Sequence, residues 1–278
     1  MTDTPQRFSS LPPAPVASPA ERIDGFAGDP NFMSSLARGL AVIQAFKERK
    51  RHLTIAQVSH RTGIPRAAVR RCLYTLMQLG YARCEGTTYS LLPKVLTLGH
   101  AYLSSTPMAV TAQPILDCLS EQLHEACNLA TLEGSEVLYI CRSAVPQRLI
   151  SVDLSVGSRL PAYCTSMGRV LLAALDDESL AEYLQGAELQ AKTSRTLHTP
   201  EALWECLQQV RAQGWCLVDQ ELEPGLRSLA VPVRDASGQV LAALNVSSHA
   251  ARSSCAELQK RFLPQLLAAS QELGQQIG

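Results

Sequence analysis

The sequence of 278 residues lacks a run of 18 apolar residues, which a membrane-spanning helix requires. Its N-terminus also lacks the short apolar segment of a secretory signal. The nine cysteines are scattered, are odd in number and include no Cys-x-x-Cys pair, which argues against a disulfide framework and against a zinc ribbon. We therefore expect a cytoplasmic protein with free thiols, no metal site and no membrane partner.

The common catalytic motifs are absent as well. The sequence contains no Gly-x-Ser-x-Gly, no phosphate-binding Walker loop, no Gly-x-Gly-x-x-Gly and no His-Glu-x-x-His. A cysteine nucleophile with a histidine base stays open, because sequence spacing does not show which side chains meet. The residues concerned are Cys141, Cys164, Cys216, His124, His198 and His249. On balance the sequence favours a protein that is not an enzyme and that carries no cofactor.

Charge is distributed unevenly along the chain, although 25 basic and 25 acidic residues give a formal net charge of zero. Residues 31–94 carry a net charge of +9, whereas residues 95–278 carry −7. A basic module followed by a larger acidic one suggests that the first module meets a polyanion. Residues 1–30 hold six of the 16 prolines and carry a net charge of −2, which predicts a disordered arm.

The basic module follows the plan of a winged helix-turn-helix over residues 31–92. Leu36, Leu40 and Ile43 recur at the spacing of an amphipathic helix. Thr54 and Gln57 have the form of a capping box at the start of a second helix. Two short strands, 81–84 and 88–91, flank a turn and predict a hairpin that serves as the wing.

A third helix, which begins after Gly63 and Pro65, predicts the DNA-reading element. Val69, Leu73 and Leu76 fall on one side of this helix, whereas its arginines fall on the other. A helix of this kind fits the major groove, and arginine recognises guanine with two hydrogen bonds. The predicted contacts to double-stranded DNA are Thr54, Pro65, Arg66, Ala67, Ala68, Arg70, Arg71, Tyr74, Thr75, Arg83 and Thr87.

Residues 93–106 predict a linker helix, which Pro107 ends. Helices then alternate with strands, which predicts an α+β domain over residues 107–278, with a mixed sheet flanked by helices. The strand at 240–247 is apolar except for Asn245 and Ser247, whose side chains share one face. If buried, they need partners, which are either backbone and loop groups or a ligand.

Four segments resemble the IclR family of bacterial transcriptional regulators. They are residues 35–40, 62–73, 157–169 and 219–232, and the match runs from about residue 31 to the end of the sequence. Within this family, residues 46–65 and 95–106 are most similar to regulators of protocatechuate catabolism through the β-ketoadipate pathway.

The resemblance implies a winged helix, a linker helix and a GAF/PAS-like effector domain, assembled as a homodimer or tetramer on palindromic promoter DNA. The closer resemblance implies an activator of protocatechuate catabolic genes that responds to a small carboxylic acid, β-ketoadipate, and acts with RNA polymerase. The alternative is a repressor of another aromatic or carboxylic acid catabolic operon. A regulator with no ligand, acting only on DNA architecture, is a further alternative that Asn245 and Ser247 argue against.

The resemblance also implies where the effector binds. The implied residues are Leu160, Tyr163, Ser166, Met167, Gly168, Val218, Asp219, Leu226, Ser228, Asn245 and Ser247. Met167 departs from the smaller residues common at its position, so it either contacts the ligand or packs in the core. A dicarboxylate needs a countercharge, for which the candidates are Arg142, Arg148, Arg159 and Arg227.

Overall fold

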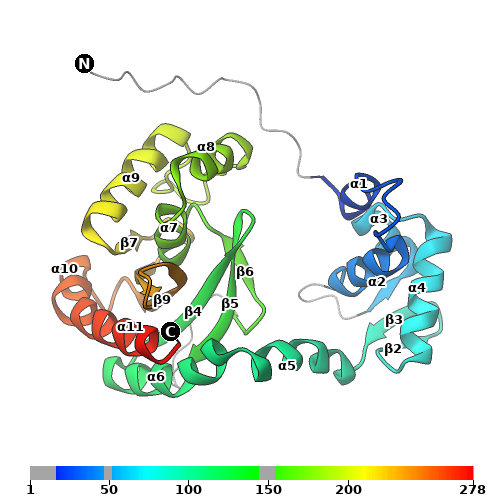
Figure 1. Ribbon diagram of the computed structural model, residues 1–278, viewed down its shortest axis with the longest axis horizontal. Coiled ribbons are helices and arrows are strands. Elements are labelled where there is room, and N and C mark those ends of the chain that lie inside the picture. Colours follow the sequence, from blue (N-terminus) through cyan, green and yellow to red (C-terminus); the bar gives the residue numbers. More distant parts are fainter. Residues whose placement is uncertain (1–16, 47–51, 144–153, 278) are drawn as a thin grey trace. The chain divides into compact units, whose positions relative to one another are not determined.

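The computed structural model describes residues 17–46, 52–143 and 154–277, and the chain forms two compact units (Figure 1). The described part of the first unit covers residues 17–102, and that of the second covers residues 103–277. No helix among the described residues is long and apolar enough to span a membrane.

The first unit is a winged helix-turn-helix. Its helices pack around buried Val42, Val58 and Leu73, and a three-stranded antiparallel sheet of order β1-β3-β2 completes it. The elements are α1 (Pro19–Asp24), α2 (Ser34–Gln44), β1 (Leu53–Thr54), α3 (Ile55–Thr62), α4 (Arg66–Gln78), β2 (Ala82–Glu85) and β3 (Thr88–Leu91).

Local signals fix the turn between α3 and α4. The Gln57 amide N–H donates to Thr54 Oγ1 at 3.3 Å, and the Thr54 N–H donates to Gln57 Oε1 at 2.9 Å, which completes the capping box. Gly63 ends α3 with a φ of 73°, a left-handed conformation that glycine adopts without a Cβ clash. These contacts fix the end of α3 and so help to set the orientation in which α4 begins.

The prediction of a disordered arm is wrong for its later part, because α1 is ordered. Ser18 caps α1 by accepting from the Glu21 N–H at 3.2 Å, and Pro19 occupies the first helical position, where proline costs no hydrogen bond. Ala20 and Ile23 then pack against the core of the first unit. Proline content suggested disorder, but this proline starts a helix. Residues 1–16 lie outside the described residues.

The passage between the units begins with a 3-10 turn, η1 (Pro93–Val95), and continues as α5 (Leu96–Ser105). The second unit then comprises α6 (Pro107–Leu123), β4 (Ala126–Glu133), β5 (Glu136–Ser143), β6 (Arg159–Pro161), α7 (Ser166–Ala173), α8 (Asp177–Gly186), α9 (Pro200–Gln213), β7 (Cys216–Asp219), β8 (Leu226–Arg234), β9 (Val240–His249), α10 (Cys255–Glu257), a π-helical turn η2 (Leu258–Phe262) and α11 (Leu263–Ile277).

The α+β class is confirmed, but the sheet is antiparallel rather than mixed. Its six strands have the order β6-β5-β4-β9-β8-β7, and every pairing among the described residues is antiparallel. Tight turns at Gly134 and Gly238 join β4 to β5 and β8 to β9. A parallel pair would need a long crossover in place of such a turn.

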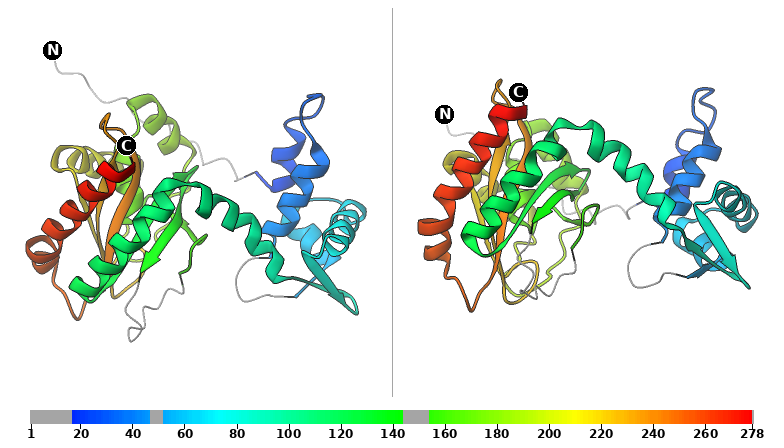
Figure 2. Two further views of the ribbon diagram at one scale, coloured as in Figure 1. Left: turned by 60° about the horizontal axis from the view of Figure 1, so that its bottom comes forward. Right: turned by 90° about the horizontal axis from the view of Figure 1, so that it is seen from below.

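The sheet separates two apolar layers (Figures 1 and 2). On one face it packs against α6 and α11, through side chains such as Leu116, Leu129 and Leu266. The other face packs against the helices α7 to α9, through Met167, Leu172 and Leu207 among others. The second face carries Asn128, Asn245 and Ser247, and it is the face where the effector was predicted to bind.

Candidate functional site

The exposed face of α4 gathers most of the residues predicted to contact DNA. Val69, Leu73 and Leu76 are buried, whereas Tyr74 on the opposite side is 62% exposed. Within the residues that the structure describes, no salt bridge engages Arg66, Arg70 or Arg71. Of the eleven predicted residues, only Thr54 and Ala68 are half-buried, and the others are exposed: Pro65, Arg66, Ala67, Arg70, Arg71, Tyr74, Thr75, Arg83 and Thr87.

The wing presents a smaller basic surface. Arg83 Nε lies 3.3 Å from Glu85 Oε1 and donates to Ser90 Oγ at 3.2 Å, so this guanidinium is partly engaged within the hairpin. Thr87 lies in the turn between β2 and β3 and is exposed. Free arginines on α4 and a short wing make a surface suited to a DNA groove and its phosphates.

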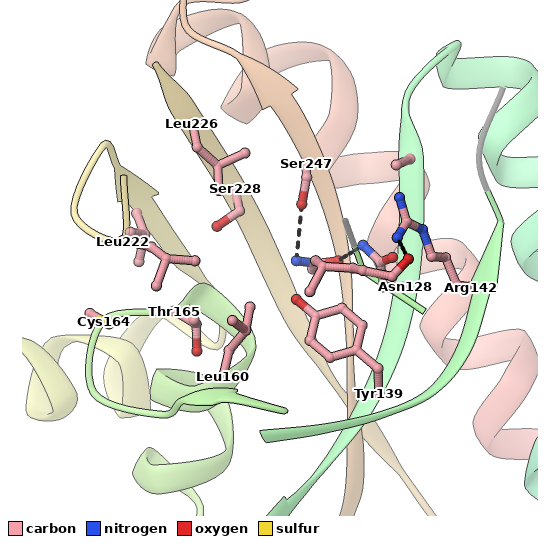
Figure 3. A pocket seen from close by; sticks show the side chains of 14 residues that line it. Asn128, Tyr139, Arg142, Leu160, Cys164, Thr165, Leu222, Leu226, Ser228 and Ser247 are labelled. Carbon is pink, nitrogen blue, oxygen red and sulfur yellow. Dashed lines mark hydrogen bonds between the residues drawn. The ribbon is translucent and has the colours of Figure 1, made fainter. Parts of the chain in front are cut away.

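A narrow cavity lies on the polar face of the second unit's sheet (Figure 3). Its volume is about 20 Å³, roughly the room that one or two water molecules need. Side chains from the sheet form one wall, and side chains from the segments that precede α7 and β8 form the other. The lining residues are Ala126, Asn128, Tyr139, Arg142, Leu154, Leu160, Cys164, Thr165, Val218, Leu222, Leu226, Ser228, Asn245 and Ser247.

Three polar side chains of the cavity form one row across the sheet. Arg142 on β5 is the register partner of Asn128 on β4, which is in turn the register partner of Asn245 on β9. Asn128 Nδ2 donates to Asn245 Oδ1 at 2.8 Å, and Asn245 Nδ2 donates to Ser247 Oγ at 3.4 Å. Directly opposed residues share a face of the sheet, so the row presents a guanidinium and two amides side by side, and the Ser247 hydroxyl adjoins the second amide.

A β-bulge in β5 adds Tyr139 to this face. Leu129 pairs with Cys141, but Ala130 pairs with Tyr139, so Ile140 is an extra residue in β5. Ile140 and Cys141 both pack in the layer with α6 and α11, whereas Tyr139 packs in the layer with α7. Without the bulge, strict alternation would place Tyr139 and Arg142 on opposite faces. Burial raises the pKa of the Tyr139 hydroxyl, so it stays protonated and able to donate.

Six of the eleven residues implied for the effector line the cavity: Leu160, Val218, Leu226, Ser228, Asn245 and Ser247. The other five lie outside its lining. Met167 lies on α7 and is fully buried in the core. Gly168 lets α7 approach the backbone of Ala162, where a Cβ would clash. Ser166 is buried too, and its hydroxyl has no partner among the described residues.

The remaining two are held by other groups. The Tyr163 hydroxyl donates to the Gln190 carbonyl at 2.7 Å. Asp219 accepts from Arg227 Nε at 2.6 Å and also pairs with Arg195. At the start of α7, the Gly168 N–H donates to Thr165 Oγ1 at 3.2 Å, so this N–H is already paired within the chain.

Of the three described arginines among those considered as a countercharge, Arg142 alone lines the cavity. Arg159 pairs with Glu133 and Glu136, and Arg227 pairs with Asp219. Arg148 lies outside the described residues. Among the described residues Arg142 makes no ion pair, and its Nη1 donates to the Leu154 carbonyl. Its charge is therefore available to an anion in the cavity.

Sequence reasoning missed Asn128 and Tyr139. Asn128 is a single polar residue within the apolar stretch 126–130, a signal similar to the one that pointed to Asn245, so the sequence could have indicated it. Tyr139 could not be placed, because no local signal in the sequence marks the bulge. Four further liners, Leu154, Cys164, Thr165 and Leu222, depend on how the outer wall folds over the sheet.

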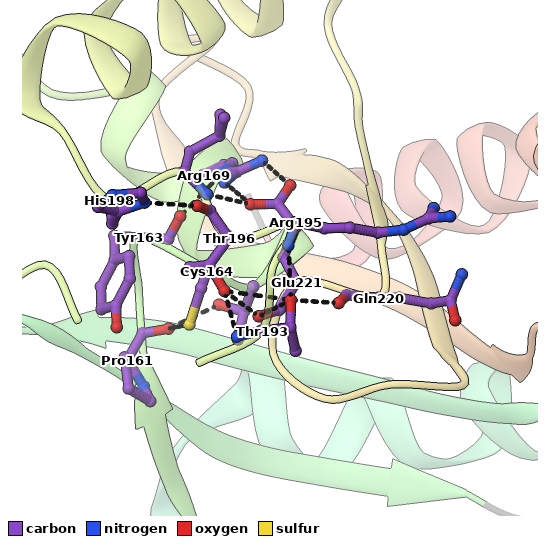
Figure 4. A network of polar contacts seen from close by, with 12 residues as sticks. Pro161, Tyr163, Cys164, Arg169, Thr193, Arg195, Thr196, His198, Gln220 and Glu221 are labelled. Carbon is purple, nitrogen blue, oxygen red and sulfur yellow. Dashed lines mark hydrogen bonds and ion pairs between the residues drawn. The ribbon is translucent and has the colours of Figure 1, made fainter. Parts of the chain in front are cut away.

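A buried ion pair ties the two segments of the outer wall together (Figure 4). Arg169 on α7 donates from Nη1 to Glu221 Oε1 at 2.7 Å and from Nη2 to Glu221 Oε2 at 2.5 Å. Its Nε donates to the Tyr163 carbonyl at 2.8 Å, next to the liners Cys164 and Thr165. Glu221 precedes the liner Leu222 and also accepts from the Leu197 N–H at 2.9 Å. This pair positions the outer wall of the cavity.

Two of the cysteines considered as nucleophiles, Cys141 and Cys164, lack the surroundings that activate a thiol. Burial raises the pKa of Cys164 and of Cys141 to about 11, so both thiols are protonated at neutral pH. The Cys164 Sγ–H faces the Pro161 carbonyl, and that of Cys141 faces the Ala109 carbonyl. Within the described ranges, no three His, Cys, Asp or Glu side chains gather as a metal site would require.

Comparison with known proteins assigns both units. The IclR helix-turn-helix domain matches residues 35–86, and the family described as the C-terminal domain of the bacterial transcriptional regulator IclR matches residues 100–275. The chain is 73% identical over 275 residues to the Pca regulon regulatory protein of Pseudomonas putida, which covers 98% of this chain and 94% of that protein.

Two further matches come from other bacteria. The p-hydroxybenzoate hydroxylase transcriptional activator of Acinetobacter baylyi is 36% identical over 247 residues, 87% of this chain and 91% of its own length. The crystal structure of a protein from Rhodococcus sp. RHA1 is 43% identical, with a TM-score of 0.78 over 88% of this chain and 98% of that one. With its basic helix-turn-helix and its polar cavity, this chain belongs to the IclR family of bacterial transcriptional regulators.

Proposed function

We propose that the protein acts in the cytoplasm as an activator of protocatechuate catabolic genes and that β-ketoadipate, bound in the cavity beside Arg142, is its effector. The observation that carries the effector site is the cavity row of Arg142, Asn128 and Asn245, which offers one cation and adjoining polar groups to a small carboxylate. A guanidinium binds a carboxylate through charge-assisted hydrogen bonds. The similarity to the Pca regulon regulatory protein supports the pathway, and the activator among the relatives supports the sign of regulation.

Effector entry requires the cavity to widen, because a dicarboxylate is larger than the 20 Å³ it offers. The sheet wall is held by strand hydrogen bonds on both sides, so the outer wall is the part that yields. Leu154 and Leu222 lie in it, outside the strands, and are half-buried. We infer that the ligand displaces these side chains, so that binding changes the conformation of the outer wall in the second unit.

DNA binding uses α4 and the wing, and we propose that the protein works as a homodimer or tetramer with RNA polymerase as its partner at the promoter. Exposed leucines support self-association: Leu36 is 58%, Leu40 is 49% and Leu96 is 75% exposed. Apolar side chains on exposed helical faces favour burial against a second protein surface. We propose no catalytic role, since Cys141, Cys164 and Cys216, the cysteines considered as nucleophiles, are buried, and in these surroundings the pKa of each thiol is raised.

The test is calorimetric titration of the purified full-length protein with β-ketoadipate, protocatechuate, 4-hydroxybenzoate and β-carboxymuconate. We expect β-ketoadipate to bind tightest, and Arg142→Gln to weaken its binding at least about tenfold, a change of roughly 1.4 kcal/mol. Arg159→Gln is the matched control, since it removes the same charge from an ion pair outside the cavity. Binding that is unaffected by Arg142→Gln contradicts the site, and tighter binding of another acid contradicts the effector.

The sign of regulation has its own test. A reporter gene behind a protocatechuate catabolic promoter should respond to β-ketoadipate only when the protein is present. Loss of expression on deleting the gene supports an activator. Raised expression on deleting it supports the repressor instead.

A further inference from the structure

Asn128 in the cavity row has a buried amide oxygen, Oδ1, that lacks a hydrogen-bond partner among the described residues. Its side chain is 2% exposed, and its Nδ2 donates to Asn245 Oδ1 at 2.8 Å. Buried polar atoms are nearly always paired, so an unpaired atom in the wall of a cavity points to a group supplied by a ligand.

The neighbours of Asn128 do not supply this partner. Arg142, its register partner on β5, directs Nη1 to the Leu154 carbonyl. Asn245, its register partner on β9, uses Oδ1 to accept from Asn128 and Nδ2 to donate to Ser247. The amide of Asn128 is thus the free end of a chain of three side chains that runs from the cavity to Ser247.

This chain of hydrogen bonds can run in either direction. Each amide has an acceptor on one side and a donor on the other, and a serine hydroxyl can accept or donate. In the direction described above, Asn128 turns Oδ1 to the cavity and accepts from a hydroxyl. With both amides turned over, Ser247 donates to Asn245, and Asn128 turns Nδ2 to the cavity and donates to an oxo oxygen.

The position of Asn128 relative to Arg142 fixes which part of a ligand it meets. Directly opposed residues on neighbouring strands have Cβ atoms about 4.5–5.5 Å apart. A carboxylate bound by Arg142 therefore brings the next carbons of the ligand to Asn128. In a 3-oxo acid, the oxo carbon is separated from the carboxyl carbon by a single methylene.

We propose that Asn128 is the specificity-determining residue of the cavity and recognises an oxygen substituent, oxo or hydroxyl, on the carbon chain beside the Arg142-bound carboxylate. The ligand class is an oxygen-substituted dicarboxylate rather than a plain one. Ser247 acts through Asn245 as a positioning residue, because it anchors the far end of the chain. This inference rests on the proposed function, since it needs a small carboxylate bound at Arg142.

The experiment is calorimetric titration of the full-length protein with adipate, 3-oxoadipate (the β-ketoadipate named above) and 3-hydroxyadipate. These acids differ only at the carbon that Asn128 would meet. We expect the wild type to bind an oxygenated acid at least about tenfold more tightly than adipate. Tighter binding of the hydroxy acid means that Oδ1 faces the ligand, and tighter binding of the oxo acid means that Nδ2 does. Either result supports the proposal.

Variants then assign the discrimination to Asn128. Asn128→Leu should bind all three acids with equal affinity, within about threefold of the wild-type affinity for adipate. Ser247→Ala should lose part of the discrimination, because the Asn245 amide loses the hydroxyl that anchors it. Thr131→Val, on the same strand but outside the lining, should discriminate as the wild type does. If Asn128→Leu does not fold, Asn128→Ala takes its place.

The outcomes separate this inference from the function on which it rests. A wild type that binds adipate as tightly as 3-oxoadipate overturns the inference and leaves a dicarboxylate effector standing. Discrimination that survives in Asn128→Leu overturns it as well. A protein that binds none of the three acids overturns both. A Ser247→Ala variant that melts at a lower temperature but discriminates normally removes Ser247 from the chain.

Discussion

The face of α4 proposed to bind DNA and the cavity proposed to bind the effector differ in how far the fold depends on their polar side chains. On α4, Arg66, Arg70 and Arg71 are exposed, and among the described residues they form no salt bridge, so the protein's own fold does not depend on them. In the cavity, Asn128 and Asn245 are buried and bonded to each other. A surface for DNA can therefore change without loss of stability, whereas a change in or around the cavity alters ligand binding and folding together.

The largest effect should come from breaking the ion pair behind the cavity. Arg169→Ala or Glu221→Ala leaves a buried charge without its partner and should destabilise the second unit by about 3–5 kcal/mol. Chemical denaturation followed by circular dichroism measures this loss. Arg159→Ala, which breaks a surface pair with Glu133 and Glu136, should cost less than about 1 kcal/mol.

A double variant tests whether the loss of stability comes from the unpaired charge. Arg169→Met combined with Glu221→Leu removes both charges and should recover part of the lost stability, because no charge is left unpaired. Its outer wall would no longer be tied together, so effector affinity should stay low. Recovery of both stability and affinity would contradict a positioning role for this pair.

On α4 the expected effect is confined to DNA. Arg70→Ala should lower operator affinity by roughly 1–3 kcal/mol with dependence on the base sequence if it reads guanine. If it contacts phosphate instead, the loss is uniform across sequences and the salt dependence becomes shallower. Electrophoretic mobility shifts at several salt concentrations distinguish the two. The melting temperature should not change.

Arg234→Ala is the matched control, since it removes an exposed arginine from the other unit. Unchanged operator affinity in both Arg70→Ala and Arg71→Ala would remove α4 as the recognition helix.

The contact of α1 with the first unit should have a smaller effect. Ile23 is half-buried against the core of that unit, so Ile23→Ala should cost about 1 kcal/mol, below the value for a fully buried isoleucine. Arg22→Ala, on the exposed side of α1, is the control. Thermal melting of the two variants measures the difference, and equal melting temperatures would mean that α1 does not contribute to the fold.

The smallest expected effect concerns acid. Burial raises the pKa of Asp219, but hydrogen bonds from Arg227 and Gln220 outweigh it and hold the pKa below its usual value. A lowered pKa in the folded state adds stability above the usual carboxyl pKa, and this stability disappears as the pH falls through the lowered value. Asp219→Asn should therefore flatten the loss of stability between about pH 5 and pH 2. Identical urea midpoints for both proteins across that range would contradict it.

The sequence predicted the face of α4 more completely than it predicted the cavity. The face of α4 is set by local signals, namely the capping box at Thr54, the turn at Gly63 and the helical spacing of Val69, Leu73 and Leu76. These act within a few residues, so the whole predicted face could be placed without knowledge of the rest of the chain. The same kind of local signal starts α1 at Ser18, and only the proline-rich composition hid it.

The cavity depends on contacts that are distant in sequence. Alternation along β9 correctly placed Asn245 and Ser247 on one face. The pairing of Asn128 with Asn245 across 117 residues, and of Arg169 with Glu221 across 52, follows from the sheet order and from α7, neither of which is written in local spacing. Met167 and Gly168 were assigned to the ligand from the resemblance, but packing against the core and against Ala162 accounts for both.

The bulge at Ile140 has a consequence for how such a cavity can diverge. Because the extra residue sets the register of β5, deleting it would exchange inward and outward side chains on one side of the deletion, bringing apolar groups to the ligand and polar ones to the core. We therefore expect an insertion or deletion in this strand to disrupt the core together with the cavity. Point substitutions of Arg142, Asn128 and Asn245 keep the register of the strands. These three positions are therefore the ones to vary in order to obtain a protein that responds to another inducer.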